Sequence, residues 1–371
     1  MPAAASAPAT KKKKIADQEI VSAPEEAAEE AGLRYVSDEQ PGYTRKQKGD
    51  DFEFFDTAGK PIKDEPRVLR IKRLAVPPAY KDVWICPSPN GHLQATGRDA
   101  RGRKQYRYHE RWREARDETK YGRMLPFAAA LPKIRRRIKA DLGLPGLPRN
   151  KVLATVLSIM QRTFIRIGNE EYARDNKSFG LTTMRNRHVE VKGAKLRFTF
   201  RGKSGVSHEV GVDDRRLARI VRKMEDLPGQ EIFAYVDEEG VACDVKSQDV
   251  NEYLREISGE DFTAKDFRTW AGTVLAAVAL HALERAGTET AAKKNVKSAI
   301  TAVSKILGNT PAVCRKCYVH PAVLEAYLTG SPIEGLKQKT EEQLEEKLEY
   351  LRSEEAAVMA FLEAHLAQAK K

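Results

Sequence analysis

The chain has 371 residues, with 65 Lys and Arg against 53 Asp and Glu, which gives a net charge of +12. Its four cysteines are too few for a disulfide scaffold of this size, and no apolar run reaches the roughly 18 residues needed to span a bilayer. Lys11 to Lys14 are not followed by an apolar stretch, as a secretory signal would require. We therefore expect a soluble cytoplasmic protein without a membrane segment.

The positive charge is concentrated in one part of the chain. Between Pro66 and Ala140 there are 20 basic and 6 acidic residues. A basic block confined to one region is typical of a protein that binds nucleic acid. The alternative is a solvated basic surface without a partner.

The first part of the chain predicts a disordered arm and then a small domain. Residues 1–32 are mostly Ala, Lys, Glu and Pro, which cannot bury enough apolar surface to become ordered. Residues 33–117 contain short alternating runs, among them "DFEFFD" and "DVWICPSPNGHLQAT", which indicate β-hairpins in a strand-rich domain. The basic stretch "RGRKQYRYHERWREARDETKYGRM" that follows has a helical pattern.

Residues 118–335 predict a mostly helical domain. Two segments carry apolar residues at helical spacing, and Gly168 is expected to end the second helix. Alternation on both sides of "RGKSG" predicts a hairpin with its turn at residues 202–205. A further helix is expected to begin after Thr263, with Asp266 completing a capping box. The fold class is therefore α+β.

The remaining segment, residues 336–371, predicts a charged C-terminal helix. Its apolar residues lie close to heptad spacing among many Glu and Lys: Leu344, Leu348, Leu351, Val358 and Leu362. We expect a solvated helix that packs on its own domain rather than a coiled coil.

The segment "LGNTPAVCRKCYVHP" combines a helix start with several reactive residue types. Thr310 can cap a helix whose first residue is Pro311. Cys314 and Cys317 lie three residues apart, but there is no second pair for a structural zinc and no βαβ pattern for a redox pair. We therefore expect no metal site, and Tyr318 becomes a candidate nucleophile.

Other segments supply the groups that a tyrosine attack on a phosphodiester requires. Arginine donates two parallel hydrogen bonds to phosphate oxygens, and Arg166 in "TFIRIGNEEYA" and Arg268 in "KDFRTWAG" are candidates for this task. A lysine can protonate the leaving oxygen, and Lys203 lies at the tip of the expected hairpin.

Taken together, these segments resemble the type IB DNA topoisomerases, specifically the compact poxvirus and bacterial branch. The resemblance extends over about residues 33–330. "RIGNEEYA" corresponds to the first arginine, Arg166, and "FRGKSGVSHE" to the hairpin lysine, Lys203. "KDFRTWAGT" corresponds to the second arginine, Arg268, and "LGNTPAVCRKCY" to the tyrosine, Tyr318. Because these four sequence motifs, called boxes below, occur in the same order as in the family, the resemblance is specific.

The resemblance also implies which residues contact DNA. The segment "GRDARGRKQYRYH" is similar to the DNA-facing segment of the family, and a tyrosine follows the first arginine. The implied DNA-contacting residues are Arg103, Lys104, Gln105, Tyr106, Tyr108, Tyr172 and Lys265.

One position departs from the poxvirus pattern. Those enzymes carry histidine nine residues before the tyrosine, where this chain has Asn309. An amide can donate a neutral hydrogen bond to a phosphate oxygen, but it cannot act as an acid or a base. The general acid is therefore expected to be Lys203, assisted by Arg166.

Two other functions remain as alternatives. A tyrosine recombinase or integrase shares the same tyrosine chemistry, but it usually has histidine both at position 309 and three residues before the second arginine, where this chain has Lys265. A non-catalytic DNA-binding module would explain the basic block but not the four boxes.

The resemblance implies an isomerase that relaxes supercoiled double-stranded DNA through a 3′-phosphotyrosyl intermediate, strand swivelling and religation. It implies neither ATP nor an obligatory metal, and no other cofactor. We expect a monomer that clamps DNA between its two domains and acts in the cytoplasm, associated with the nucleoid.

Overall fold

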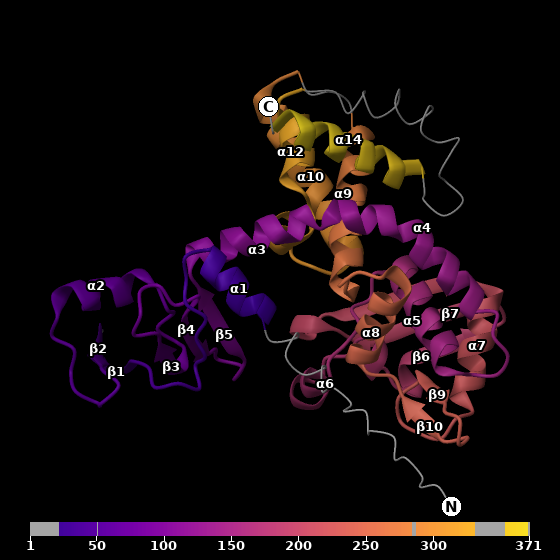
Figure 1. Ribbon diagram of the computed structural model, residues 1–371, viewed down its shortest axis with the longest axis horizontal. Helices are drawn as coiled ribbons and strands as arrows, with labels where there is room; N and C mark the ends of the chain where they lie inside the picture. The colour runs from indigo at the N-terminus through magenta and orange to yellow at the C-terminus, as the bar shows by residue number, and fades with distance from the viewer. Residues whose placement is uncertain (1–21, 50, 284–286, 331–352, 370–371) are drawn as a thin grey trace, which may run out of the picture. The chain divides into compact units, whose positions relative to one another are not determined.

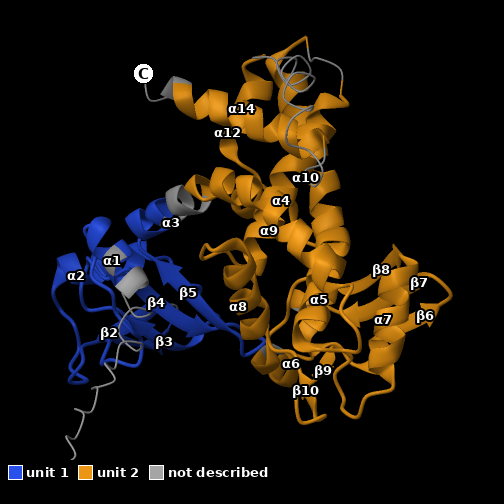
Figure 2. Cartoon of the chain, turned by 45° about the vertical axis from the view of Figure 1, so that its right-hand side comes forward, with its two compact units in different colours: residues 1–120 blue, residues 121–371 orange. Residues whose placement is uncertain are grey.

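The computed structural model describes residues 22–49, 51–283, 287–330 and 353–369. The chain divides into two compact units, residues 1–120 and 121–371, coloured separately in Figure 2. Each unit is described by itself. The predicted α+β class is confirmed, because unit 1 is rich in strands and unit 2 in helices. None of the helices in the described ranges combines the length and the apolar character that a membrane crossing requires.

The described residues of unit 1 form short strands and the helices α1, α2 and α3 (Figure 1). In chain order its elements are α1 (Ser22–Glu30), β1 (Thr44–Lys48), β2 (Asp51–Phe55), α2 (Glu65–Arg73), β3 (Lys81–Ile85), β4 (Leu93–Arg98), β5 (Lys104–Tyr108) and α3 (Glu110–Gly122), whose last two residues belong to unit 2.

Two antiparallel sheets form unit 1, as the alternating runs predicted. Strands β1 and β2 make a hairpin, and β3, β4 and β5 make a three-stranded sheet in that order. Tyr43, just before β1, bridges to Ile85 at the end of β3, and the hairpin and the sheet share one small core that includes Phe54, Ile71 and Ala95. The hairpin predicted in "DVWICPSPNGHLQAT" is confirmed as β3 and β4, whereas "DFEFFD" forms β2, which pairs with the strand before it.

Two predictions for unit 1 are wrong. Residues 104–108 were expected to begin a helix, but they form β5, which pairs along β4 with Tyr106 opposite Thr96. The buried strand β4 requires a partner on its second edge, and this outweighs the local helical pattern. Residues 22–30, expected to be disordered, form α1, because Ala28 and Leu33 are buried with Trp112. Residues 1–21 lie outside the described part.

The described part of unit 2 contains most of the helices, two small sheets and the larger core. Its helices are α4 (Met124–Asp141), α5 (Arg149–Thr163), α6 (Glu170–Asn176), α7 (Arg215–Glu225), α8 (Ser247–Ser258), α9 (Ala264–His281), α10 (Glu289–Leu307), α11 (Pro311–Tyr318), α12 (Pro321–Leu328) and α14 (Ser353–Ala369). Its strands are β6 (Val189–Lys192), β7 (Lys195–Arg201), β8 (Ser207–Asp213), β9 (Ala234–Val236) and β10 (Ala242–Asp244). Short 3-10 helices occupy Leu181–Thr183, Asn186–His188 and Lys203–Gly205.

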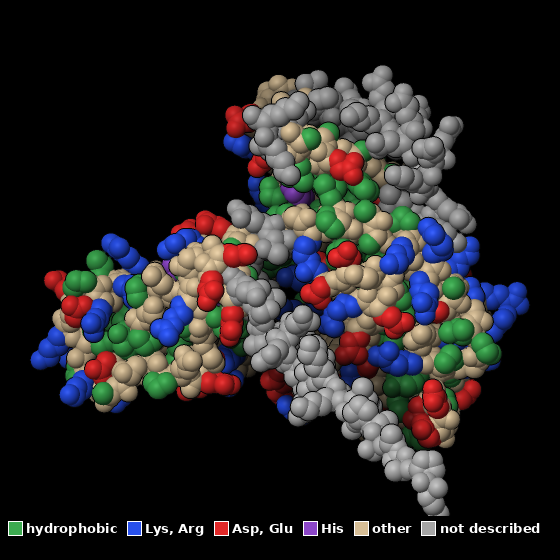
Figure 3. Space-filling model, in the orientation of Figure 1, with side chains coloured by type: hydrophobic (Ala, Val, Ile, Leu, Met, Phe, Trp, Pro, Cys, Tyr) green, Lys and Arg blue, Asp and Glu red, His purple; other side chains and the backbone are tan. Residues whose placement is uncertain are grey.

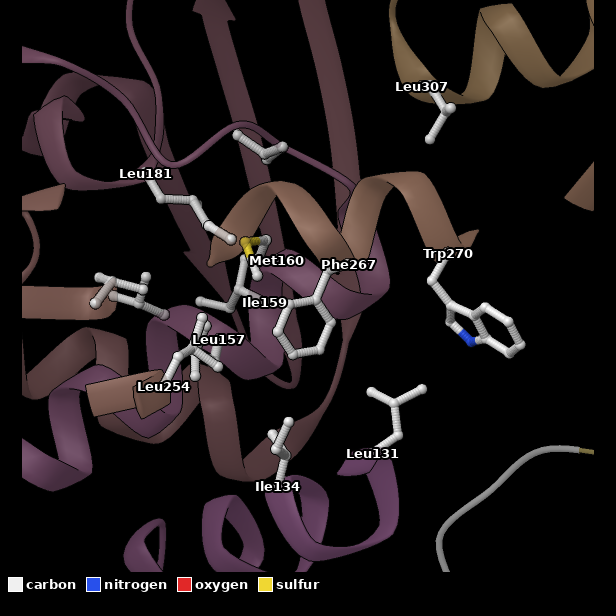
Figure 4. Close-up of a cluster of buried hydrophobic side chains, with 14 of the residues drawn as sticks. Leu131, Ile134, Leu157, Ile159, Met160, Leu181, Leu254, Phe267, Trp270 and Leu307 are labelled. Atoms are coloured by element: carbon white, nitrogen blue, oxygen red, sulfur yellow. The ribbon is translucent and has the colours of Figure 1, made fainter. Parts of the chain in front are cut away.

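The core of unit 2 lies where α4, α5, α8 and α9 pack together. Figure 4 shows Leu131 and Ile134 of α4, Leu157 of α5, Leu254 of α8 and Phe267 of α9 around this space. Helix α5 is buried along almost its whole length, so it forms the centre of the unit. The ends of the surrounding helices are thereby held in fixed positions.

The local signals in unit 2 are largely confirmed. Strands β7 and β8 form the predicted hairpin, with Arg201 opposite Ser207 and the turn between them. The carboxylate of Asp266 accepts a hydrogen bond of 2.8 Å from the backbone N–H of Thr263, as in the predicted capping box. One boundary is wrong: α5 ends at Thr163, before Gly168, because Phe164 takes a left-handed conformation and caps it.

Helix α14 packs on its own unit, as expected of the C-terminal segment. Val358 and Leu362 are buried in the core of unit 2. The carboxylate of Glu355 accepts hydrogen bonds of 2.6 and 2.8 Å from Arg135 and one of 3.1 Å from the indole of Trp270. Leu344, Leu348 and Leu351 lie outside the described residues.

Candidate active site

The guanidinium of Arg268 lies at the centre of the candidate site. Its side chain extends from α9, and only 4% of the residue is exposed. One terminal nitrogen donates to the carbonyl of Phe164 and the other to that of Leu307, at 2.7 Å for the second. These carbonyls end α5 and α10, where helix dipoles favour a cation. Burial, followed by the charge of Arg166, lowers the pKa of Arg268, and an arginine so placed remains charged.

Arg166 lies in the loop that follows α5. Its guanidinium donates to the carbonyl of Gly308 at 3.4 Å and to Oδ1 of Asn309. The loop is held by the backbone N–H of Leu181, which donates to the carbonyl of Arg166 at 2.9 Å. Arg166 therefore reaches across to the end of α10 from a different part of the chain.

Asn309 follows Gly308, the residue that caps the C-terminal end of α10. Gly308 takes a positive φ of 61°, which a residue with a side chain rarely adopts, and this turns the chain toward α11. The backbone N–H of Asn309 donates to the carbonyl of Ser304 at 2.9 Å. The amide oxygen is occupied by Arg166, so the amide nitrogen is the group left for a ligand.

Two buried donors at this site have no partner among the described residues: Nε of Arg268 and Nδ2 of Asn309. Buried polar groups in folded proteins are nearly always hydrogen-bonded, so such groups call for an explanation. Here both are donors, and both belong to a cluster with two positive charges. The arrangement is therefore suited to bind an anion such as a phosphate.

Tyr318 is the last residue of α11 and lies beside this anion site. The side-chain oxygen of Thr310 caps the helix by accepting from the N–H of Val313 at 3.3 Å, as predicted. The guanidinium carbon of Arg268 lies 5.1 Å from the centroid of the Tyr318 ring. Burial by itself raises the pKa of the phenol, but the charges of Arg268 and Arg166 outweigh it, so the pKa of Tyr318 is lowered.

The backbone of Tyr318 is held closely by α9 and by Tyr121. A Cβ at Gly272 would lie 2.5 Å from the carbonyl oxygen of Tyr318, so only glycine allows this approach. The hydroxyl of Thr273 lies 3.2 Å from the same carbonyl and accepts from the N–H of His320 at 3.0 Å. The hydroxyl of Tyr121 lies 3.0 Å from the carbonyl of Val319. Backbone contacts, rather than side-chain contacts alone, therefore set the position of the phenol.

We expect Gly272→Ala to slow DNA cleavage without weakening DNA binding. The added methyl group meets backbone atoms of Tyr318, so the end of α11 must move. A displacement near 1 Å costs about 10² in rate, and overpacking costs about 1–3 kcal/mol of stability. Single-turnover cleavage, DNA affinity and thermal unfolding check this. Gly122→Ala is the matched control, because a Cβ there would meet nothing within 4 Å. Normal cleavage by Gly272→Ala would contradict the close approach.

Lys203 is not brought into contact with the other candidate residues. It is exposed in the turn of the β7–β8 hairpin, and it forms no hydrogen bond or ion pair with any described residue. The remaining four, Arg166, Arg268, Asn309 and Tyr318, form one cluster.

The candidate DNA-contacting residues of unit 1 lie along β5. Lys104, Tyr106 and Tyr108 share one face: the ammonium of Lys104 lies 5.6 Å from the ring of Tyr106, whose ring stacks on that of Tyr108 at 6.0 Å. Tyr106 and Tyr108 are 46% and 39% exposed. Arg103 and Gln105 both bond to the carboxylate of Asp99, at 2.7 and 3.0 Å. A row of exposed aromatic and basic groups suits contact with a nucleic acid.

Two further candidates lie in unit 2. Lys265 is exposed in the first turn of α9, three residues before Arg268. Tyr172 lies in α6, but its side chain is outside the described part of the structure. On the face seen in Figure 3, Lys and Arg side chains lie on the surface of both units.

The two cysteines near Tyr318 are free thiols. Burial raises the pKa of Cys314 to about 11, so this thiol stays protonated at neutral pH. Within the described ranges, no group of three or more His, Cys, Asp or Glu side chains is placed to hold a metal ion.

Several residues that support the site were not predicted from the sequence: Tyr121, Gly272, Thr273 and His208, whose ring lies close to Gly202 and Gly308. His208 and Gly272 stand within the quoted boxes "FRGKSGVSHE" and "KDFRTWAGT", but only the charged residue of each box was singled out. A glycine followed by threonine inside an apolar helix indicates a close contact. No local pattern indicates the role of Tyr121.

A tyrosine with a lowered pKa beside two arginines and free hydrogen-bond donors suits attack on a phosphodiester. This arrangement is compatible with the class of enzymes that cleave a DNA strand. Comparison with known proteins agrees. Residues 109–360 match the family described as eukaryotic DNA topoisomerase I, catalytic core, and residues 51–99 match the bacterial DNA topoisomerase IB, N-terminal domain.

Individual proteins match over most of the chain. The DNA topoisomerase 1B of Acanthamoeba polyphaga mimivirus is 31% identical over 319 residues, which cover 84% of this chain and 95% of the viral one. The DNA topoisomerase 1B of vaccinia virus (strain Copenhagen) is 24% identical over 271 residues, covering 71% and 82%. The chain belongs to the type IB DNA topoisomerases, in their compact form. It is therefore an isomerase that relaxes DNA by cleaving and religating it, and the recombinase alternative is not favoured.

Proposed function

We propose that Tyr318 is the nucleophile of this topoisomerase. Once the phenol has lost its proton to solvent, its phenolate oxygen bonds to a backbone phosphorus while the bond from phosphorus to the 5′-oxygen breaks. This leaves a 3′-phosphotyrosyl link and a 5′-hydroxyl end. The supporting observation is Arg268, which lies 5.1 Å from the ring of Tyr318 and has a buried donor without a partner in the described residues. One arginine can thus stabilise both the phenolate and the phosphate.

The other three residues of the cluster, together with Lys203 of the hairpin turn, carry out the remaining steps. Arg166, Arg268 and Asn309 donate to the non-bridging oxygens, where negative charge increases in the transition state. Lys203 gives its proton to the departing 5′-oxygen, which leaves as the hydroxyl. Its turn lies at the exposed tip of a hairpin, from which the side chain can reach bound DNA. In religation the 5′-hydroxyl attacks phosphorus, Lys203 takes the proton back, and Tyr318 leaves.

The covalent link conserves the energy of the phosphodiester bond, so no ATP is required. While one strand is cut, the free 5′ end rotates about the intact strand and relaxes supercoils of either sign. We propose that a single chain clamps duplex DNA with both units, with Tyr106 and Tyr108 among the contacts from unit 1. Most of the affinity then comes from phosphates and falls as salt rises. Supercoiled DNA of the nucleoid, in the cytoplasm, is the substrate.

Incubation with a negatively supercoiled plasmid, without ATP or magnesium, tests this function. A ladder of relaxed topoisomers supports the proposal. Plasmid multimers or site-specific exchange would instead indicate a recombinase. A shift in plasmid mobility without any change in linking number would indicate a DNA-binding module.

We expect relaxation to persist in excess EDTA. Two arginines and one lysine provide positive charge that magnesium supplies in many other phosphoryl-transfer sites. Magnesium can still speed turnover by screening the contacts that hold the product. Single-turnover cleavage with and without EDTA separates the two effects, and complete loss of cleavage in EDTA contradicts the proposal.

The double variant Cys314→Ala with Cys317→Ala is also expected to retain cleavage in the same assay.

A further inference from the structure

The ring of His208 lies between two turns that carry candidate catalytic residues. A Cβ at Gly202 would lie 2.6 Å from Cδ2 of this ring, and a Cβ at Gly308 would lie 2.4 Å from Cε1. On a further side the ring stacks on Phe200, with centroids 5.1 Å apart and planes 21° apart. The imidazole is therefore in close contact with backbone at both glycines.

Each of the two glycines immediately precedes a candidate catalytic residue. Gly202 immediately precedes Lys203, and its N–H donates to the carbonyl of Val206 at 2.8 Å, which closes the hairpin turn. Gly308 immediately precedes Asn309, and its carbonyl accepts from Arg166. His208 thus acts as a spacer between the turn of the proposed general acid and the turn of the anion site.

The electrostatic surroundings favour a neutral spacer. Burial, followed by the charges of Arg166 and Arg268, lowers the pKa of His208, so the ring is uncharged at neutral pH. These arginines are the charged groups that act on it. A flat, neutral ring fills the space without adding a third cation to the cluster. A lysine or arginine here would compete with the two arginines for the phosphate.

We infer that His208 is a positioning residue that sets the place of Lys203 relative to the anion site formed by Arg166, Arg268 and Asn309. This inference rests on the proposed function, because it assumes that Lys203 protonates the leaving oxygen. Lys203 is exposed and forms no hydrogen bond or ion pair with the described residues, so its position follows from that of its turn. The stacked ring and its two glycine contacts provide that placement.

The test uses two DNA substrates, one normal and one with sulfur as the bridging 5′ atom, a leaving group that hardly needs a proton. With normal DNA we expect His208→Ala to slow single-turnover cleavage about 10- to 100-fold, since misplacing a catalytic group by 1 Å costs up to about 10². With the sulfur substrate most of this loss should disappear. The double variant of His208→Ala with Lys203→Ala should cleave normal DNA no more slowly than Lys203→Ala alone. Both changes impair the same step, the proton transfer from Lys203 to the leaving oxygen.

His188→Ala is the matched control. His188 is more buried than the half-buried His208 and is likewise packed against a phenylalanine, with its ring 4.4 Å from that of Phe179. Its ring nitrogens contact Arg185 and Arg187, which belong to neither turn. The His188→Ala change should lower stability, and any slowing of cleavage should be the same on the normal and the sulfur substrate. If His208→Ala does not fold, His208→Asn, which keeps a smaller polar group in the space, replaces it in every measurement.

Equal slowing of His208→Ala on both substrates would overturn the inference, as would additive losses with Lys203→Ala. The proposed function is tested separately by Tyr318→Phe on the sulfur substrate. If that variant still forms a covalent adduct, the nucleophile is wrongly assigned. If it forms none and sulfur rescues Lys203→Ala but not His208→Ala, only the role of His208 fails.

Discussion

Replacement of Tyr318 by phenylalanine is expected to abolish the covalent adduct with DNA while DNA binding is retained. The ring, its packing against α9 and its contact with Arg268 all remain, since the structure places the guanidinium over the ring face. Only the oxygen that forms the bond to phosphorus is lost. An ordinary phenol has a pKa near 10, so a hydroxyl elsewhere, without two arginines beside it, cannot replace it.

Detergent trapping of the protein–DNA adduct measures this directly, together with DNA affinity at fixed salt. Tyr327→Phe is the matched control, because Tyr327 is another half-buried tyrosine of unit 2 whose hydroxyl contacts the side chain of Asn295 at 2.6 Å. This variant should form the adduct normally. An adduct in Tyr318→Phe would show that another residue is the nucleophile.

Lys203→Ala is expected to slow cleavage of normal DNA by about 10²–10⁴, the usual contribution of a general acid. Its affinity for DNA should change little beyond the loss of one cation. Sulfur at the bridging 5′ position should restore most of the rate, because the leaving thiolate needs no proton. Single-turnover rates on the two substrates measure the effect.

Asn309→Ala should behave in the opposite way. Asn309 donates only a neutral hydrogen bond, so its loss is expected to cost about 10²–10³ in rate, as for one oxyanion donor. Cleavage and religation should slow together, and bridging sulfur should not rescue the variant. If sulfur rescues Asn309→Ala and leaves Lys203→Ala inactive, the roles of the two residues are reversed.

Local sequence rules predicted several elements correctly. The alternating residues around "RGKSG" predicted the hairpin that carries Lys203, and the structure confirms it. Thr263 with Asp266, and Thr310 with Pro311, predicted the starts of α9 and α11. These features depend on residues only a few positions apart, so the local sequence is enough to predict them.

Predictions failed where contacts between distant residues decided the conformation. Residues 104–108 have a helical pattern, yet they form β5 because β4 pairs with them along its second edge. Residues 22–30 lack large apolar side chains, yet α1 forms because Ala28 is buried against Trp112. The end of α5 depends on Phe164, whose left-handed backbone directs its carbonyl toward Arg268. Such strain persists only where the surrounding structure enforces it.

By itself, the sequence determined the family, the order of the four boxes and the chemistry that each residue type can perform. Only the tertiary structure decided that Arg166, Arg268, Asn309 and Tyr318 form one site, because they are brought together by the ends of α5, α9, α10 and α11. It also decided that Gly272 contacts Tyr318 and that His208 lies between two turns. Burial, unpaired donors and the lowered pKa of Tyr318 arise from packing between segments far apart in the chain. No pattern of neighbouring residues contains that information.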